Sequence, residues 1–475
     1  MKKNISFCLI VKNEEKTIER CLESVCDIVD EIIVGDTGST DNTINLAKSF
    51  NKTKVIKIDW KDDFSYARNQ VLKEAKGEWI LVFDADEVIA KKDSVKIVNL
   101  IKQNSKEAYC FPVRHYVNES KRPNFIFCDN EYEESKGALG YITTEKLCFF
   151  KNKEGIYYTG LIHETLEESF LKQDISSDRV KIIVHHYGYL NQKASKKLRE
   201  KKIKRYVALG KKQIEETPKK AKPYYDLAVT YINNEEYAEA LEYLEEAIHF
   251  NPRYFDALYH LALVSLRLKN YEKAKGIFLG LLKTFPKKSD LLLNAGIVHM
   301  KLQRYDEAIA YFNKSVEIDK NMVLAYYNMG IISQARGDLA FAIENFNKVL
   351  KINPKFTMAN SAVGVAYFLV KDYQKAKENF LKVSADIPEF FEARYNLGLI
   401  YQMQEEYKEA IKEYKRVLDS DKNHINANYN LAYVYQKLGN YSQALVFYKK
   451  TVSLDSRTSL EINKRIKEMQ EEGLV

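Results

Sequence analysis

Two hydrophobic periodicities divide this chain of 475 residues. Before residue 190, short apolar runs alternate with stretches in which apolar residues recur at helical spacing. The apolar runs cover residues 5–11, 31–34, 55–58 and 79–83, and the helical stretches cover 14–26, 41–50 and 64–76. Residues 107–186 are rich in strand-like segments and include a polar insertion at 119–140. Alternating strands and helices predict an α/β domain over residues 1–190, with a parallel sheet covered on both faces.

Beyond residue 220, small and aromatic residues recur with a period of 34 residues. Each unit has Ala or Gly at its eighth position and Ala twelve residues later. The eighth positions are Ala228, Ala262, Gly296, Gly330, Gly364, Gly398 and Ala432. Small residues allow two antiparallel helices to pack closely, and this period is typical of the tetratricopeptide repeat. We predict seven repeats over residues 221–458, forming an all-α superhelix, and a capping helix over residues 459–475.

The composition is that of an ordinary soluble protein, with 45% hydrophobic and 29% charged residues. Apolar runs stay well short of the roughly 18 residues that a membrane-spanning helix needs. Residues 1–6 lead into a short apolar run and lack the pattern of a signal peptide. The six cysteines lie in the first third of the chain without paired spacing, so we expect them to be reduced. These features predict a cytoplasmic protein.

Polar residues follow four of the apolar runs, at the predicted carboxyl ends of the strands. The four segments are Val11–Glu14, Asp36–Asp41, Asp59–Asn69 and Asp84–Glu87. In an open α/β sheet, ligands bind beyond the carboxyl ends of the strands, so the segments should converge. Asp84 and Asp86 supply the hard oxygen ligands that suit Mg²⁺ or Mn²⁺ held together with substrate phosphates. The alternative is that both carboxylates stabilise a turn or cap a helix.

In this order, the four segments resemble the inverting family 2 glycosyltransferases, over residues 4–90 and again over 158–189. The segments 60–69, 160–164 and 186–189 are similar to the sublancin-type peptide S-glycosyltransferase group, which also carries a repeat domain. The insertion around residues 129–136 does not match that group, and the repeats here are more regular, so a peptide thiol is one acceptor among several. The resemblance implies a GT-A fold with a Rossmann-like mixed sheet, a nucleotide-sugar donor of the UDP type, and Mg²⁺ or Mn²⁺.

The resemblance also implies which residues hold the nucleotide. Asp36 would accept a hydrogen bond from the uracil imide. The backbone near Val11 and Asn13 would line the base pocket. Arg68 matches an arginine that contacts the base.

For the metal and the ribose, the resemblance points to the end of the fourth strand. Asp84, followed by Ala85, would lie near the ribose and the metal. Asp86 would coordinate the ion that bridges the two phosphates, where a metal stabilises the charge of the leaving group. His186 matches a position that supplies a further metal or phosphate contact, although a histidine at a strand end can equally be structural.

On the acceptor side, an inverting transfer needs a general base, and a carboxylate is the usual choice. Glu164, with His163 beside it, is the candidate for the base or for acceptor binding. The alternative is that Glu164 is only a residue at the start of a helix.

Residues 191–220 predict a basic helix that links the two halves. Between 193 and 212 there are ten Lys or Arg and one Glu, a local charge of +9. Because the whole chain carries +8, the remainder is about −1, and nucleic acid is not expected as a partner. Three interpretations of the helix stay open: a solvated linker, contact of Arg199 or Arg205 with donor phosphates, and attraction to an acidic acceptor or, peripherally, an anionic membrane surface.

Repeat arrays of this type commonly bind peptides on their concave face. The sixth position of four units is occupied by Asn294, Asn328, Asn396 and Asn430, whose amides can hold a peptide backbone or belong to the packing of the repeats. We therefore expect a metal-dependent hexosyltransferase with a peptide or protein acceptor. A cell-envelope glycan or a lipid-linked saccharide is the alternative acceptor, and an interaction scaffold with an inactive transferase domain is the alternative class.

Overall fold

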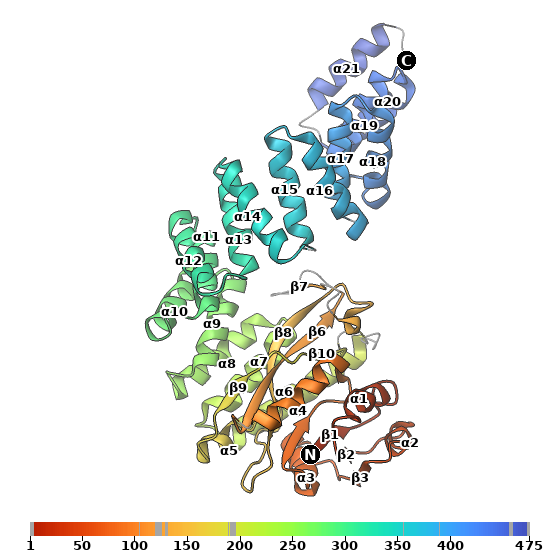
Figure 1. The fold of residues 1–475 in the computed structure, drawn as a ribbon. Helices are drawn as coiled ribbons and strands as arrows, with labels where there is room; N and C mark the ends of the chain where they lie inside the picture. Colours follow the sequence, from red (N-terminus) through yellow and green to blue (C-terminus); the bar gives the residue numbers. More distant parts are fainter. Residues whose placement is uncertain are drawn as a thin grey trace. The chain divides into compact units, whose positions relative to one another are not determined.

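The computed structural model describes residues 4–103, 105–118, 126–128, 132–188, 190, 196–354, 356–388, 390–455 and 459–472. The chain divides into two compact units, Met1–Thr284 and Phe285–Val475. The first unit holds the α/β domain, the basic helix and the first two repeat pairs, and the second unit holds the remaining helices (Figure 1). The domain limits at 190, 220 and 458 that the sequence pattern suggests stay predictions.

A single mixed sheet forms the centre of the first unit. Its strands among the described residues are β1 (Ile5–Val11), β2 (Glu31–Asp36), β3 (Thr53–Lys57), β4 (Trp79–Val82), β5 (Glu87–Ile89), β6 (Ala108–Val117), β7 (Ile126–Phe127), β8 (Gly140–Lys151), β9 (Ser177–Arg179) and β10 (Val184–His186). The order along the sheet is β3-β2-β1-β4-β8-β6-β10-β5, with β7 beside β8 and β9 beside β6. The predicted strands at 55–58 and 79–83 are shifted by one or two residues.

Strands β1 to β4 are parallel, with Val11 opposite Asp36 and Cys8 opposite Val82, so their carboxyl ends lie at one edge. The parallel arrangement expected for the first four strands is present, and beyond β4 the sheet is mixed. Strand β8 runs antiparallel to both β4 and β6, and β5 runs antiparallel to β10. Parallel neighbours need a crossover connection, usually an α-helix, and between β6 and β8 the described residues contain only the short 3-10 helix Glu133–Ser135. The mixed sheet that the family resemblance implies is confirmed.

Helices cover both faces of the sheet. On one face, α1 (Ile18–Val25), α2 (Thr43–Lys48) and α4 (Lys91–Gln103) pack on a core that includes Phe7, Val34 and Leu81. On the other face, α3 (Phe64–Glu74) and α5 (Glu167–Lys172) pack on a core that includes Cys8 and Ile80. This alternation along each strand is the expected consequence of burial on both faces.

Two helices begin later than predicted because polar groups form turns ahead of them. The backbone N–H groups of Thr17 and Ile18 donate to the carbonyl oxygen of Glu14, so the turn at 14–17 precedes α1. The carboxylate of Asp41 accepts a hydrogen bond from the N–H of Thr43 at 3.0 Å and delays α2 to that residue. The side chain of Asp63 accepts from the N–H of Tyr66 at 2.8 Å and caps α3 at its predicted start.

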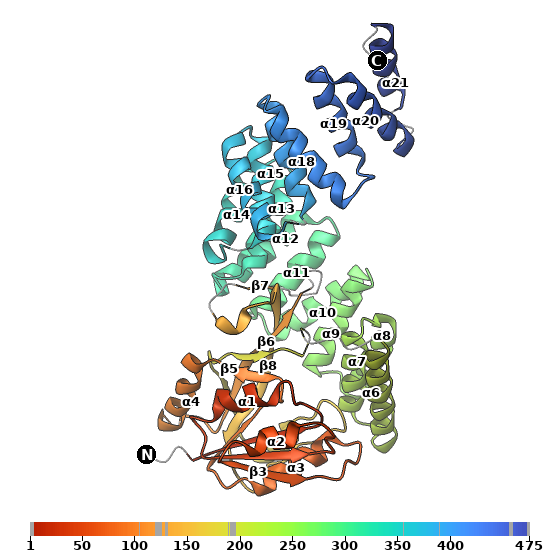
Figure 2. The same cartoon turned by 90° about the vertical axis from the view of Figure 1, so that its right-hand side faces the viewer.

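The basic helix and the first two repeats form five helices in the first unit. They are α6 (Lys196–Glu216), α7 (Ala221–Asn233), α8 (Tyr237–Phe250), α9 (Phe255–Arg267) and α10 (Tyr271–Thr284). Figure 2 shows α6 beside α7 and α8. The helix predicted over 193–212 is therefore present from 196, and residues 193–195 lie outside the described residues.

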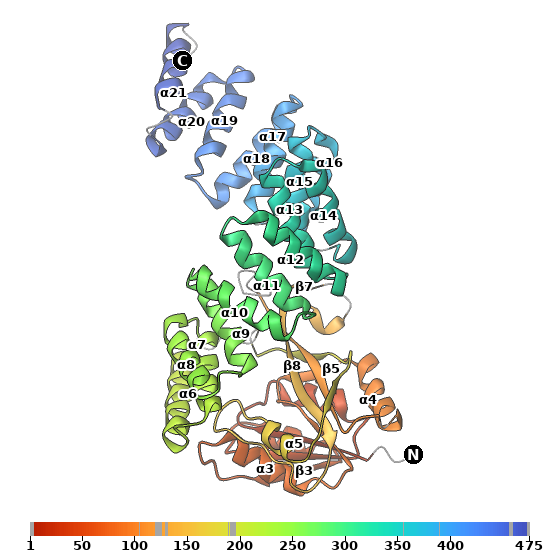
Figure 3. The ribbon, with the colours of Figure 1, turned by 90° about the vertical axis from the view of Figure 1, so that its left-hand side faces the viewer.

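The second unit is a regular array of helix pairs (Figure 3). Its helices are α11 (Ser289–Lys301), α12 (Tyr305–Ile318), α13 (Val323–Ala335), α14 (Leu339–Ile352), α15 (Thr357–Leu369), α16 (Tyr373–Asp386), α17 (Phe391–Met403), α18 (Tyr407–Ser420), α19 (Ile425–Lys437), α20 (Tyr441–Leu454) and α21 (Ser459–Glu471). The need for small residues is visible at Gly330 and Gly398, where a Cβ atom would lie 2.5 Å from the rings of Phe346 and Tyr414. Within the described part of the chain, we find no helix with the length and apolar character of a membrane span.

Candidate active site

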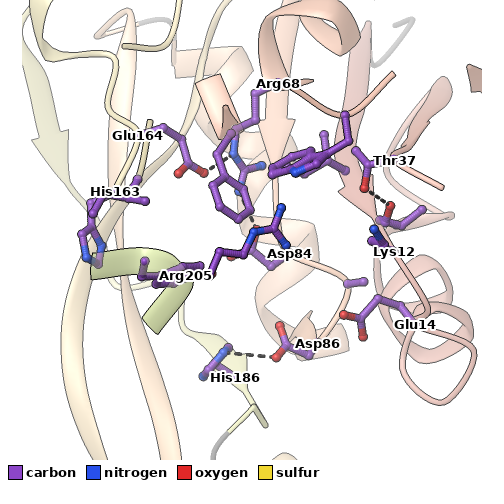
Figure 4. A pocket seen from close by; sticks show the side chains of 17 residues that line it. Lys12, Glu14, Thr37, Arg68, Asp84, Asp86, His163, Glu164, His186 and Arg205 are labelled. Atoms are coloured by element: carbon purple, nitrogen blue, oxygen red, sulfur yellow. Dashed lines mark hydrogen bonds and ion pairs between the residues drawn. The ribbon is translucent and has the colours of Figure 1, made fainter. Parts of the chain in front are cut away.

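A cavity of about 460 Å³ lies beyond the carboxyl ends of the parallel strands (Figure 4). Its volume falls in the usual range for small-molecule sites. Eight of the ten residues singled out from the sequence line it: Val11, Arg68, Asp84, Ala85, Asp86, His163, Glu164 and His186. Its wall is formed by the end of β1, the loops that follow β1 to β4, α3, the segment 162–164, β10 and α6. The predicted convergence of distant segments at one sheet edge is thus present in the structure.

Asp86 and His186, the last residue of β10, lie next to each other in the cavity wall. Oδ2 of Asp86 lies 3.3 Å from Nε2 of His186, and the two side chains point toward one another in Figure 4. Burial alone would lower the pKa of His186, but the carboxylate of Asp86 raises it. Gly188 closes the arrangement, because a Cβ atom there would lie 2.7 Å from both Oδ2 of Asp86 and the His186 ring. Only glycine fits beside this pair.

Asp84 and Asp86 bond to different side chains, and the N–H of Glu87 donates to the carbonyl oxygen of Asp84 in the turn that contains both. Arg68 donates to Oδ1 of Asp84 at 2.6 Å, and Lys146 donates to Oδ2 at 3.0 Å. Burial would raise the pKa of Asp84, but Lys146 and Arg68 hold it well below its usual range. Both oxygens of Asp84 are therefore bonded to cationic side chains.

Glu164 lies across the cavity from Asp86 (Figure 4). Its carboxylate accepts from Nε of Arg68 at 2.5 Å, and its side chain is 15% exposed. His163 has a φ of 51°, a left-handed conformation that is uncommon outside glycine. Its Nε2 lies 3.1 Å from the hydroxyl of Thr230 in α7, and burial lowers its pKa. The structure thus turns Glu164 toward Arg68 and His163 toward the first repeat.

Asn13 and Asp36 do not line the cavity. The side-chain oxygen of Asn13 accepts from the N–H of Thr40 at 2.7 Å. Oδ1 of Asp36 accepts from the N–H of Ser39 at 2.8 Å. Both side chains therefore shape the loops that follow β1 and β2, and their predicted roles at the base stay predictions.

Helix α6 supplies residues to the cavity. Arg205 and Tyr206 line it, together with Trp60 and Phe64. Nη2 of Arg205 lies 2.5 Å from the carboxylate of Asp62, and its guanidinium carbon lies 5.2 Å from the centre of the Trp60 ring. The ring of Phe64 meets those of Trp60 and Tyr206 edge-on at 4.9 and 5.9 Å. One wall of the cavity is therefore aromatic, with a cationic edge.

Some residues of this arrangement carry no local sequence signal. Lys146 lies in the segment Thr143–Lys146, which has the pattern of an exposed strand, yet its amino group reaches Asp84. Tyr206 lies in α6, where the many Lys and Arg residues dominate the sequence pattern. The side chain of Arg199, the other predicted phosphate contact, lies outside the described residues.

The side chains of Asp86 and His186 suit a divalent cation that is also coordinated by a bound ligand. Around an octahedral ion with bonds of about 2.1 Å, neighbouring ligands lie about 3 Å apart, close to the separation of Asp86 and His186. Within the ranges described, no group of three or more His, Cys, Asp or Glu side chains is arranged to hold a metal alone. A cation here needs oxygens from a diphosphate or from water, which is the usual situation for Mg²⁺.

Two sets of family models match the chain. Residues 6–150 match the model of glycosyl transferase family 2. Residues 225–287, 287–355 and 389–457 match models of the tetratricopeptide repeat.

Individual proteins match parts of the chain. A TPR repeat-containing protein of Synechococcus elongatus is 34% identical over 191 residues, covering 39% of this chain and 42% of that protein. The SPbeta prophage-derived glycosyltransferase SunS of Bacillus subtilis is 27% identical over 262 residues, covering 53% of this chain and 55% of that protein. The matches thus span about half the length of these relatives. The solved structure of YrrB, a TPR protein, is 19% identical and covers 40% of this chain and 97% of that chain, with a TM-score of 0.37.

Proposed function

Because this chain carries a glycosyl transferase family 2 domain followed by tetratricopeptide repeats, we propose that it is a metal-dependent, inverting glycosyltransferase. It takes a hexose from a nucleotide-sugar donor, of the UDP type, and transfers it to a peptide or protein. The observation that carries the proposal is the cavity in which Asp86 and His186 oppose Glu164. A cytoplasmic location is part of the same proposal.

In this proposal Asp86 and His186 hold Mg²⁺ or Mn²⁺ against the donor diphosphate. When bound, the cation acts as a Lewis acid that stabilises the charge of the departing nucleoside diphosphate. Asp84 contributes by holding Arg68 in place, since both its oxygens are already bonded. Val11 and Ala85 line the floor of the nucleotide site, and the aromatic wall of Trp60 and Phe64 offers a stacking surface for a ring.

Glu164 acts as the general base. An acceptor hydroxyl or thiol gives its proton to this carboxylate, bonds to C1 of the sugar, and displaces the diphosphate oxygen from the opposite face. Arg68 fixes the carboxylate through its Nε at 2.5 Å, so the base is pre-oriented before the acceptor arrives. Inversion follows from this single displacement.

The repeats recruit the acceptor. The amides of two predicted peptide-gripping residues are engaged inside the array: Asn430 donates to the Tyr395 hydroxyl at 3.0 Å, and Asn294 donates to the carbonyl oxygen of Asp290 at 2.9 Å. Recognition of the acceptor at these positions would therefore rely on neighbouring side chains.

The test of the chemistry is UDP release from UDP-glucose by the full chain with Mn²⁺. Turnover should fall at least about 100-fold with EDTA and in D86A. A full rate in D86A, or an equal rate in EDTA, would contradict the proposed site. A matched control is D256N, which changes an exposed aspartate of the second repeat.

The acceptor class is tested with UDP-[¹⁴C]glucose and a cell lysate separated after reaction into protein, peptide and chloroform-extractable fractions. Label in the protein or peptide fraction supports the proposal. Label confined to the chloroform fraction favours a lipid-linked saccharide. A chain that neither binds UDP nor releases it belongs to the scaffold class instead.

A further inference from the structure

Five charged side chains form a continuous line that alternates in sign, and three of them line the cavity. The order is Glu87, Lys146, Asp84, Arg68 and Glu164, with successive N–O separations of 2.5, 3.0, 2.6 and 2.5 Å. They come from β5, β8, the end of β4, α3 and the segment after Gly160. The line joins the donor side of the cavity, at Asp84, to the candidate base on the acceptor side.

Most of this line is withdrawn from solvent. The side chains of Glu87, Arg68 and Glu164 are 4%, 8% and 15% exposed, and that of Lys146 is 23% exposed. Asp84 is the exception, with a side chain that is 43% exposed. A buried charge that loses its partner is costly, so the four more buried members depend on their neighbours for their positions. Glu87 anchors one end, because its Oε2 accepts both from Lys146 and from the N–H of Asp84 at 2.8 Å.

Arg68 divides its donors between two carboxylates. Its Nε donates to the carboxylate of Glu164, and its Nη2 donates to Oδ1 of Asp84. Its Nη1 is buried and has no hydrogen-bond partner among the described residues. A guanidinium prefers to bind a carboxylate with two parallel hydrogen bonds, so Asp84 would take Nη1 as well if its Oδ2 were released. What holds Oδ2 away from Arg68 is the amino group of Lys146.

We infer that Lys146 is a positioning residue for the proposed sugar transfer, acting through Asp84 and Arg68 on Glu164. By holding Oδ2 of Asp84, Lys146 keeps the guanidinium of Arg68 at the position from which its Nε reaches Glu164; a second bond to Asp84 would draw the guanidinium toward Asp84 and its Nε away from Glu164. The inference rests on the proposed function, because it concerns the base of that reaction. Asp86 and His186 lie outside the line, so the binding of metal and nucleotide should not depend on Lys146.

The first experiment compares K146M with the wild type, using UDP release from UDP-glucose with Mn²⁺ and calorimetric titration of UDP with Mn²⁺. We expect kcat to fall at least about tenfold through misplacement of Glu164, while the Kd of UDP stays within about threefold. K151M, on the same strand, is the matched control and should keep the wild-type kcat. A wild-type kcat in K146M, or a loss confined to UDP affinity, would overturn the inference.

To distinguish the positioning of Glu164 from a purely structural role of Lys146, K146M is also introduced into the E164Q variant. Residues that act as one unit have strongly non-additive effects, so K146M should lower the residual rate of E164Q by less than about twofold. An equal loss in both backgrounds would show that Lys146 does not act through Glu164. If K146M does not fold, K146Q replaces it, since its side chain stays polar but is uncharged and one bond shorter than that of lysine.

A crystal structure of the variant decides the inference independently of turnover. In K146M, both oxygens of Asp84 should bind Arg68, and Nε of Arg68 should lie beyond hydrogen-bond distance from Glu164. An unchanged pair of Arg68 and Glu164 would refute the inference even in an active enzyme. If the wild type neither binds UDP nor releases it, the proposed function fails, and the Arg68–Glu164 separation still decides the role of Lys146.

Discussion

Asp226 in α7 is a buried carboxylate at the position where four other repeats carry Asn. The residue is 1% exposed. Its Oδ1 accepts from Lys222 at 2.8 Å, whereas its Oδ2 is buried with no hydrogen-bond partner among the described residues. Burial raises the pKa of Asp226 to about 6, although Lys222 opposes the shift. Replacing it by Asn, which the array accommodates elsewhere, should therefore change the pH dependence of stability.

The sign follows from proton binding. The folded state holds this proton more tightly than the unfolded chain, whose pKa is 3.8. The stability that the group contributes is complete below about pH 4 and is lost as the pH rises through about 6. At pH 7.5 the lost stability amounts to about 3 kcal/mol. About 2 kcal/mol of it is lost between pH 4.5 and 7.5. D226N removes this titration, and the ion pair with Lys222 needs no separate correction because its effect is already contained in the folded pKa.

We therefore expect D226N to raise the free energy of unfolding by about 3 kcal/mol at pH 7.5 and by about 1 kcal/mol at pH 4.5. Both tryptophans, Trp60 and Trp79, lie in the same compact unit as Asp226, so urea unfolding followed by tryptophan fluorescence reports on that unit. D256N serves as the control and should follow the wild type at both pH values. If D226N and the wild type lose stability in parallel between pH 4.5 and 7.5, Asp226 does not titrate as argued.

Three further changes test other parts of the structure. G188A should weaken Mn²⁺-dependent UDP binding about tenfold in calorimetry, because its methyl group would separate Asp86 from His186. R205A should weaken UDP binding by about five- to tenfold with little change in Tm, whereas K204A, on the same helix but outside the cavity, should bind normally. G330A should cost about 1–3 kcal/mol in thermal unfolding followed by circular dichroism, because its Cβ would meet Phe346, whereas the open helical site of G276A should gain up to about 1 kcal/mol. Wild-type UDP binding by G188A or R205A, or a more stable G330A, would contradict these assignments.

The parts of the fold that were predicted well are those set by local pattern. The repeats follow from a period that the packing of small residues against aromatic rings enforces, and the family models confirm them. The pairing of a family 2 domain with repeats is likewise confirmed. The cavity residues near Asp84 were predictable because strand ends in a parallel sheet share one edge.

The parts that were not predicted depend on strand register and on loop geometry. Lys146 reaches Asp84 because β8 pairs antiparallel with β4, with Phe149 opposite Leu81. A shift of one residue would turn Lys146 to the other face, and nothing in its local sequence specifies that register. Asp36 and Asn13 illustrate the converse: their residue types suit a ligand, but their side chains bond to neighbouring loop backbone.

The basic helix is more than a solvated spacer, because its contacts reach the loop that carries Glu164. The side-chain oxygen of Gln213 in α6 accepts from the N–H of Leu161 at 2.9 Å, and His163 in the same loop meets Thr230 of α7. Arg68 therefore bonds to Glu164 itself, whereas α6 and α7 bond to Leu161 and His163 of the same loop. The interpretation of α6 as part of the site thus follows from its uncharged contacts as much as from its charge.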